Sequence, residues 1–465
     1  MRFAGTWRCQ ERPTVAGEAR ESVTRALVEA VRGICYDEIP REARETAHHC
    51  LLDFLGVALG GSCEPLVGIL VDQVVRGEAA SEAGIIGRPE RASRLTAALV
   101  NGAAGHALDF DDTHTTMTGH PSVPVLPALL ALAESEGADG RALLAALVAG
   151  VELECRVGAL LGGGHYLAGF HSTGTIGTFG AAAACAHLLG LGPDGWLHAL
   201  GLAGTQAAGL KSGFGTMAKP LHAGRAASAG LLSALLARGG FTAQPGILEV
   251  PQGFAATHAG PEPSAEVLAG YAGRFLIRDT LFKFHAACYL THAAIEAAAQ
   301  LRARHGLDAE KVRAVDVQVA PPLLDVCNIE APTTGLEGKF SLRATTALAL
   351  LGEDTTDLTT YSDAKMAEPR LIALRDRVRV IPTEGMGPTQ ARVQVETNDQ
   401  RGEAEVDTGI PAADLKTQGE RLGRKFLALA APVLGAGRAE ALSDAVSSVQ
   451  KIDSVGELLH LARPG

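Results

Sequence analysis

The chain has 465 residues, of which 47% are hydrophobic and only 4% aromatic, and its formal net charge is -11. This length favours two domains, and an apolar content carried mostly by Ala, Leu and Val favours closely packed helices over an aromatic-rich β sandwich. Because the sequence has no basic stripe, we expect no nucleic-acid-binding surface, although a pocket can still gather local positive charge for a small anionic substrate.

Eight cysteines are scattered through the chain without a CxxC pair, and several lie within apolar helical patterns. We therefore expect buried free thiols in a reducing compartment. The N-terminal segment lacks the apolar stretch of a signal peptide, and no run of about 18 apolar residues occurs. These features predict a soluble, cytoplasmic protein, with residues 1–20 as a flexible N-terminal extension.

Helical patterns begin near Glu21 and fill the first half of the chain. The segment IPREARETAHHCLLDFLGVALGG has Pro40 in a first-turn position and closes on a glycine pair, as a helix of this length would. Further amphipathic or apolar runs predict helices at 92–108, 123–136, 140–160, 174–189, 194–209, 221–238 and 286–305.

The pattern changes after Gly306. VRAVDVQVA and RVRVI alternate with the period of a strand, and ARVQVETNDQRGEAEVDTG predicts two strands around a polar turn. Helical patterns lie at KFSLRATTALALLG, at 412–435 and from 439 onward. Together these segments predict a mainly α fold, in which a helical domain (21–274 and 409–465) receives an inserted α+β domain (275–408).

A polar segment, HALDFDDTHTTMTGH, interrupts the apolar sequence. It holds three carboxylates and three imidazoles, at Asp109, Asp111, Asp112, His106, His114 and His120. Ser122 as N-cap and Pro124 in the first turn predict that a helix begins just after this segment. The unpaired N–H groups and partial positive charge of a helix N-terminus suit a substrate carboxylate.

The same arrangement, a basic side chain beside a predicted helix start, recurs along the chain. The further basic residues placed in this way are His171, Lys219, Lys283 and Lys339. Taken singly, each is usually a capping or surface residue. Their repetition supports the hypothesis that they converge on a dry cationic pocket for two or three substrate carboxylates.

A series of motifs extends over nearly the whole chain: HALDFDDTH with HPSVPVLPALLALAE, FHSTGTIGTFGAAAACAHLLGL, TMAKPLHAGRAASAGLLSALLA, KFHAACYLTHAAIEAA and EGKFSLRATTALAL. In this order they resemble the motifs of the MmgE/PrpD family. That family includes 2-methylcitrate dehydratase, cis-aconitate decarboxylase and iminodisuccinate epimerase, so the motifs indicate the family rather than one reaction.

The resemblance implies a helical domain from both chain ends, an α+β lid domain, a homodimer, and chemistry on a small polycarboxylate without cofactor or metal. Carried over motif by motif, it assigns the active site to Asp109 and Thr113 (DFDDT), His120, His171, Lys219 and Lys283. Four residues of the same motifs are further candidates for substrate binding: Ser172, Thr173, His222 and Lys339.

Reactions of this family form or quench a carbanion next to a carboxylate, which requires a base and positioned cations. We expect His120 to be the principal acid/base, because imidazole both accepts and donates a proton near neutrality. Asp109 would orient His120 or Thr113. His171, Lys219 and Lys283 would bind carboxylates or complete the proton transfer, and His171 or Lys219 could protonate a leaving hydroxyl.

The function favoured by the sequence is a hydro-lyase of the 2-methylcitrate dehydratase kind, acting on a small di- or tricarboxylate. The alternatives are an epimerase of an iminodisuccinate-like acid, a cis-aconitate-type decarboxylase and a non-catalytic acid-binding protein. Ala344 stands where family members often carry a tyrosine after the KFS motif, which argues against decarboxylation. Since no HxxxH, HExxH or paired-cysteine spacing occurs, we expect no metal site.

Overall fold

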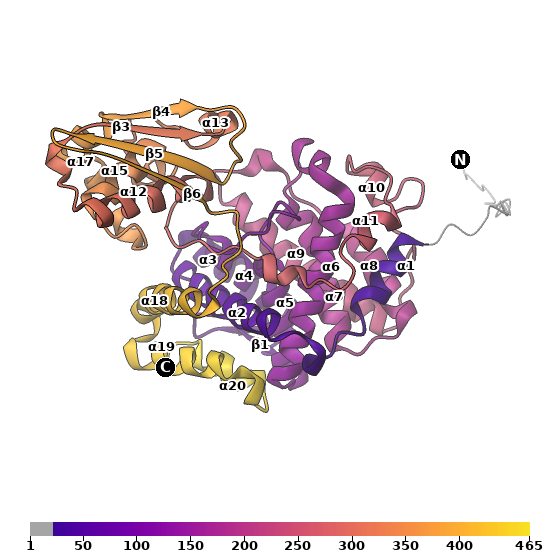
Figure 1. The fold of residues 1–465 in the computed structure, drawn as a ribbon. Coiled ribbons are helices and arrows are strands. Elements are labelled where there is room, and N and C mark those ends of the chain that lie inside the picture. Colours follow the sequence, from indigo (N-terminus) through magenta and orange to yellow (C-terminus); the bar gives the residue numbers. More distant parts are fainter. Residues whose placement is uncertain (1–21) are drawn as a thin grey trace, which may run out of the picture.

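The computed structural model describes residues 22–465, and the predicted extension at 1–20 lies outside this range. A large helical body and a smaller α+β body lie next to each other (Figure 1). Besides its helices, the helical body contains one short antiparallel pair, β1 (Ala83–Gly84) and β2 (Arg91–Ala92). The predicted mainly α fold is confirmed.

Segments from both ends of the chain form the helical body (Figure 1). Its first part contains α1 (Val23–Val31), α2 (Arg41–Gly61), α3 (Pro65–Leu70), α4 (Arg94–His106), α5 (Ser122–Glu136), α6 (Gly140–Leu167), α7 (Ser172–Leu188), α8 (Pro193–Gln206), α9 (Ala218–Arg238), α10 (Phe254–Thr257) and α11 (Ala265–Ala269). Its second part contains α18 (Leu415–Leu434), α19 (Ala436–Ser447) and α20 (Val455–Leu461). Helix α18 packs against α2, so the C-terminal segment returns to the first long helix.

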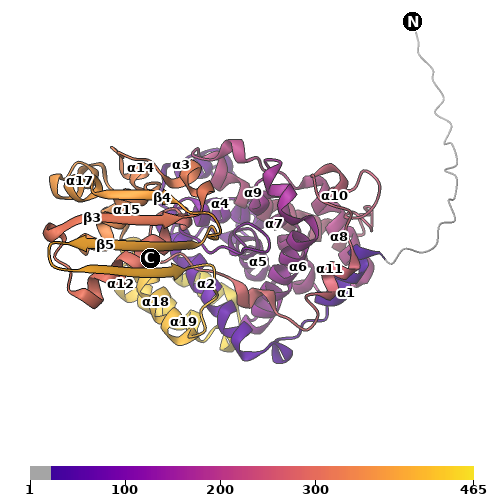
Figure 2. The same cartoon turned by 45° about the horizontal axis from the view of Figure 1, so that its top comes forward.

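The α+β body has a four-stranded sheet with helices on one face (Figure 2). Its strands are β3 (Val312–Val319), β4 (Val378–Pro382), β5 (Gln390–Thr397) and β6 (Arg401–Asp407), and its helices are α12 (His292–His305), α13 (Leu324–Cys327), α14 (Gly335–Lys339), α15 (Leu342–Leu351), α16 (Asp363–Met366) and α17 (Pro369–Arg375). The strand order is β4-β3-β5-β6, and only β3 and β4 run parallel. Buried and more exposed residues alternate along β5, because one face of the sheet packs against α12. Helix α15 packs against β4 at the opposite edge of the sheet.

The sequence predicted most helix limits to within a few residues, with two informative exceptions. The helix predicted at 140–160 continues to Leu167, past a break at Gly162 where φ is 60°. The helix predicted at 286–305 begins only at His292. The residues before it use their N–H groups elsewhere, since Ala286 donates to the Thr355 carbonyl and Cys288 to the Lys339 carbonyl.

Two glycines let α4 and α9 approach each other closely. A Cβ atom at Gly102 would lie 2.7 Å from the Cα atom of Gly224, and a Cβ at Gly224 would lie 2.1 Å from the Leu99 carbonyl oxygen. Helices can pack backbone against backbone only where such small residues meet. This contact holds the C-terminal end of α4, with His106, near the start of α9, which carries Lys219 and His222.

In the described part of the chain, no single helix is long and apolar enough to cross a membrane. One pair, Arg41–Gly61 with Pro65–Val75, meets the criteria of length and composition together, but it is bent by 80° and most of its first helix is buried in the core. All cysteines among residues 22–465 are free; five are buried as expected, and Cys35 and Cys63 are exposed.

Candidate active site

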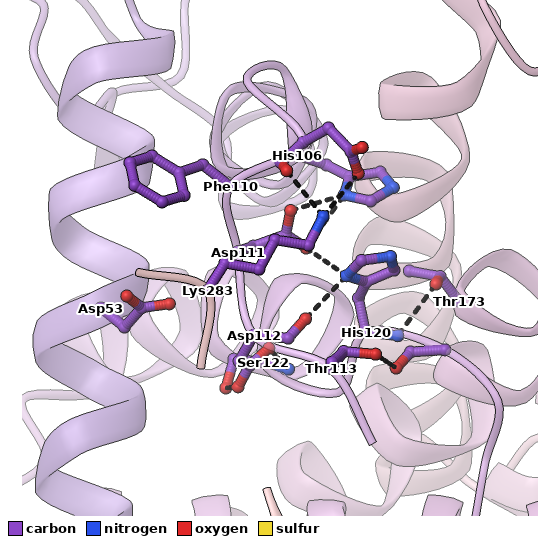
Figure 3. A network of polar contacts seen from close by, with 12 residues as sticks. Asp53, His106, Phe110, Asp111, Asp112, Thr113, His120, Ser122, Thr173 and Lys283 are labelled. Atoms are coloured by element: carbon purple, nitrogen blue, oxygen red, sulfur yellow. Dashed lines mark hydrogen bonds and ion pairs between the residues drawn. The ribbon is translucent and has the colours of Figure 1, made fainter. Parts of the chain in front are cut away.

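The polar segment between α4 and α5 forms the centre of the candidate site (Figure 3). Asp109 has a φ of 50°, which is uncommon for a residue other than glycine and costs conformational energy. A pair of backbone hydrogen bonds of 2.8 Å ties Thr113 to Leu281, close to Lys283 in the sequence. The segment is therefore held in a defined shape against a strand-like stretch from far along the chain.

His120 has one ring nitrogen committed to a donor role. Its Nδ1–H donates to the Asp112 carbonyl oxygen at 2.6 Å, and the Asp111 carboxylate lies 3.1 Å from the same nitrogen (Figure 3). Since a carbonyl oxygen can only accept, this contact fixes the tautomer and leaves Nε2 to accept or deliver a proton. The side chain is 14% exposed, so a substrate can reach it.

Asp111 accepts from a second imidazole. His106 Nδ1 lies 2.9 Å from Asp111 Oδ2, and both side chains are almost completely buried. The sequence-based expectation was that Asp109 orients His120 or Thr113, but the carboxylate beside His120 is that of Asp111. Thr113 instead donates its hydroxyl to the Gly119 carbonyl at 3.2 Å.

Asp109 pairs with two lysines from distant segments. Lys219 Nζ lies 2.6 Å from Asp109 Oδ1, and Lys283 Nζ lies 3.1 Å from the same oxygen and 2.6 Å from the Asp109 carbonyl oxygen. The side chains of Asp109, Lys219 and Lys283 are 30%, 17% and 2% exposed. The protein's own carboxylate thus occupies the space between two ammonium groups.

The charges of this cluster follow from its surroundings. Burial alone would raise the pKa of Asp109, but Lys219 and Lys283 draw that pKa well below its usual range. Burial opposes the charge of Lys219, and the pKa of Lys219 is nevertheless raised because Asp109 lies beside it. Asp109 and Lys219 are therefore charged near neutral pH.

His171 and His222 extend the cluster. His171 occupies the N-cap position of α7, as the sequence predicted, and its Nδ1 lies 3.1 Å from Nδ1 of His222. Its ring stacks on that of His106 with centroids 5.6 Å apart. Burial lowers the pKa of His171 well below its usual value, with His106 and His120 adding to the effect, and burial lowers the pKa of His106 to about 4. Both rings are therefore neutral near pH 7.

A buried acid, Asp112, lies beside His120, whose ring donates to its carbonyl oxygen. Burial raises the pKa of Asp112 to about 8, and Asp53 adds to this shift. The Ser122 hydroxyl donates to Asp112 at 2.5 Å and the Ser122 N–H donates to the other carboxylate oxygen at 3.2 Å. Helix α5 begins at Ser122 itself and its N-cap is Pro121, so the predicted capping role of Ser122 was wrong.

The remaining predicted residues lie around this cluster. Thr173 accepts the His120 backbone N–H at 3.1 Å, and Ser172 is buried as the first residue of α7. Lys339 lies with its Nζ 5.9 Å from the centre of the Tyr361 ring, and burial lowers its pKa although Asp109 is near enough to oppose this.

The idea of several converging helix N-termini is correct only in part. His171 stands directly before α7, whereas Lys219 lies inside the first turn of α9. Lys283 lies in an extended stretch nine residues ahead of α12, and Lys339 ends the short helix α14. Lys219 reaches the polar segment because α9 packs against α4, and Lys283 reaches it because the stretch around Leu281 pairs with Thr113. Their convergence does not depend on a shared local motif.

Several residues of the site were not among the predicted ones. His106 and Asp111 stand in the polar segment, but nothing in its sequence indicates that they pair with each other. Asp53 in α2 and Lys425 in α18 carry no recognisable signal in the sequence. Lys425 is 6% exposed and donates to Asp53 at 2.6 Å directly behind the polar segment.

Among residues 22–465, one group of histidines and carboxylates is compact enough to hold a metal ion. It consists of His106, Asp111 and His120, whose ligand atoms lie within 4.8 Å of one another. The Nδ1–H hydrogen bonds described above explain the same short distances without an ion. A metal would have to replace those protons, so the arrangement suits proton transfer at least as well as metal binding.

The side chains of Asp109, Lys219 and His120 are partly exposed to solvent. Cavities of about 590 and 570 Å³ lie elsewhere: the first is bordered by Arg41, Arg44 and His48, and the second by Arg156 and Tyr271.

Comparison with known protein families gives two matches along the chain. Residues 25–266 match the MmgE/PrpD N-terminal domain, and residues 285–451 match the MmgE/PrpD C-terminal domain. The first contains the polar segment and Lys219, and the second contains Lys339 and Lys425.

Curated relatives are similar over most of their length. The chain is 28% identical to the cis-aconitate decarboxylase of Aspergillus terreus over 95% of this chain and 96% of that protein. It is 28% identical to the cis-aconitate decarboxylase of Homo sapiens over 77% of this chain and 76% of that protein. A cis-aconitate decarboxylase-like protein of Aspergillus oryzae is likewise 28% identical, over 95% of this chain and 97% of that protein.

Proposed function

The chain belongs to the MmgE/PrpD family, and we propose that it is a lyase that forms a carbanion next to a carboxylate of a small di- or tricarboxylate. The observation that carries this proposal is the position of His120. Its Nδ1–H is committed to Asp112 and Asp111, while the two ammonium groups of Lys219 and Lys283 meet at Asp109 in the same segment. These contacts support an acid/base at His120 and an anion site at the two lysines in one place.

In this proposal a substrate carboxylate takes the place of the Asp109 side chain between the lysines. The ammonium groups then stabilise the enediolate that develops when the neighbouring carbon carries negative charge. His120 Nε2 exchanges the proton at that carbon, and Asp111 stabilises the imidazolium when the ring holds the second proton. Burial lowers the pKa of His171 and that of the half-buried His222, so these two imidazoles add no positive charge to that of the lysines.

Within the lyase class, we place cis-aconitate-type decarboxylation first, because the curated relatives are cis-aconitate decarboxylases. Loss of CO2 from the methylene carboxylate would leave an allylic carbanion. A proton from His120 at the carbon beside another carboxylate would complete the product, so one proton is consumed for each CO2 released. The absence of the family tyrosine at Ala344, a fully buried position, is the reason to test other acids as well.

Dehydration, which the sequence alone favoured, is the second candidate. It needs an acid for the leaving hydroxyl in addition to the base. The hydrogen-bonded pair of His171 and His222, 3.1 Å apart beside His106, can relay such a proton. The predicted homodimer and cytoplasmic location stay predictions.

The experiment that tests the proposal is incubation of the purified chain with a panel of acids in deuterated water, followed by proton NMR. The panel contains cis-aconitate, 2-methylcitrate, citrate and a dicarboxylate such as iminodisuccinate. Decarboxylation, dehydration and exchange of the α proton each give a distinct spectrum. If every acid only stabilises the protein against unfolding, without reaction or exchange, the chain is a binding protein and the proposal is wrong.

A further inference from the structure

Lys425 lies deep in the structure and far along the sequence from the polar segment and from Lys283, yet it contacts both. It belongs to α18, and its side chain is 4% exposed. We propose that Lys425 is a positioning residue that holds the polar segment and the Lys283 segment in one fixed arrangement. This inference concerns the same site and depends on the proposed function only for its effect on turnover.

Each of the three N–H bonds of the Lys425 ammonium group faces a different oxygen. The distances are 2.6 Å to Asp53 Oδ1, 2.6 Å to the Phe110 carbonyl and 2.9 Å to the Lys283 carbonyl. An ammonium group has no further donor, so all its hydrogen-bonding capacity is used. The group also lies 4.0 Å from the centre of the Phe110 ring, which shields these contacts from water.

Two of these acceptors, the Phe110 and Lys283 carbonyls, belong to the backbone of the proposed active site. Phe110 lies between Asp109, which engages the lysines, and Asp111, which holds His120. The Lys283 carbonyl belongs to the residue whose side chain reaches Asp109. One ammonium group therefore bonds to the main chain of both segments at the positions where their functional side chains depart.

A single contact between the two segments would leave them free to rotate about it. The hydrogen-bond pair between Thr113 and Leu281 joins their main chains, and the Lys283 side chain reaches Asp109. Lys425 adds a third attachment, which joins the Phe110 and Lys283 carbonyls through one ammonium group. Together these attachments fix the distance and the angle between the segments. His120 and the two lysines then keep the spacing that a substrate requires.

Energetics favour a positioning role over a stabilising one. Burying an ammonium and a carboxylate costs desolvation energy that their attraction barely repays, and apolar replacements of such pairs are often as stable. The burial shifts the pKa of Lys425 downward and that of Asp53 upward, which shows the same penalty on both partners. Asp53 Oδ2 moreover has no hydrogen-bond partner among the described residues. The pair of Lys425 and Asp53 therefore contributes mainly by fixing the positions of the Phe110 and Lys283 main chains.

The experiment compares Lys425→Met with Lys416→Met, a control on the same helix whose side chain is 87% exposed. Histidine labelled with ¹³C at Cε1 reports the surroundings of His106 and His120 in the full chain, and cis-aconitate turnover reports function. We expect both imidazole resonances to move in Lys425→Met and to stay in place in Lys416→Met. The kcat/KM of Lys425→Met should fall about 100-fold, the usual effect of a small displacement of catalytic groups.

A merely structural role would lower the melting temperature and leave these resonances unchanged in the folded protein, which would overturn the proposal. If Lys425→Met does not fold, the same imidazole resonances are measured in Asp53→Asn, which removes the counter-charge of Lys425 while keeping a hydrogen-bond acceptor. The resonances should then move in the same directions by a smaller amount, and unmoved resonances would refute the proposal. If the wild-type chain turns over none of the acids, the proposed function fails while the imidazole comparison still tests Lys425.

Discussion

The strongest consequence of the site geometry concerns Asp109. If this carboxylate occupies the place of a substrate carboxylate, then Asp109→Asn should bind a tricarboxylate more tightly while it loses turnover. Asparagine is the conservative replacement, because it tolerates the left-handed backbone that Asp109 adopts at φ 50°. Most substitutions in an active site weaken binding, so a gain in affinity is an unusual result.

The magnitude follows from the two contacts that a ligand must break. Asp109 Oδ1 lies 2.6 Å from Lys219 and 3.1 Å from Lys283, and hydrogen bonds between charged groups contribute roughly 1.5 to 3 kcal/mol net. Because Asp109 is 30% and Lys219 17% exposed, water already weakens the pair, which favours the lower end of this range. Removing about 1.5 kcal/mol of competition should tighten binding about tenfold.

The assay is isothermal titration calorimetry with tricarballylate, a tricarboxylate that has no double bond and no hydroxyl group to eliminate. Asp316→Asn is the matched control, because Asp316 also pairs with a basic side chain, Arg379 at 2.7 Å, but on the sheet of the α+β body. The control should bind as the wild type does. Asp109→Asn should in addition turn over cis-aconitate more slowly, since the negative charge that holds the two lysines close together in the resting state is gone.

Unchanged or weaker binding in Asp109→Asn would refute this reasoning. It would mean that the lysines serve only to hold Asp109, and that the substrate carboxylates bind elsewhere. Tighter binding in both Asp109→Asn and Asp316→Asn would instead indicate a general effect of lowering the negative charge of the chain.

Three further outcomes follow from the same structure. His120→Ala should lower turnover by about two to four orders of magnitude, the usual contribution of a general acid/base, and near-normal turnover would remove His120 from the mechanism. Glu154→Gln should leave stability unchanged near pH 4 and raise it by more than about 1 kcal/mol near pH 8 in urea unfolding. Burial, with Asp112 nearby, holds the pKa of Glu154 in the folded protein well above its usual value. The stability that Glu154 contributes is therefore complete below its pKa in the unfolded chain and is lost as pH rises toward its pKa in the folded protein. Equal dependence of unfolding free energy on pH in both proteins would contradict this. Dialysis against EDTA should not change turnover, and a loss that zinc restores would make His106, Asp111 and His120 a metal site.

The sequence by itself determined the elements and the chemical character of the protein. Hydrophobic periodicity located the helices, and alternation located the four strands, because both depend on which side of each element faces the core. It also located the residues that lie at the start of their own helices, such as His171. Local signals of this kind depend only on neighbours along the chain.

Only the tertiary structure decided how the polar residues are paired. The partners of Asp109 are 110 and 174 residues away, and Lys425 meets Phe110 across 315 residues. No spacing in the sequence indicates such pairs, because they arise where α18 returns to α2 and the chain crosses between the two bodies. The choice of Asp111 rather than Asp109 as the partner of His120 has the same origin: the direction of each carboxylate is set by the cations and imidazoles that the fold brings beside it.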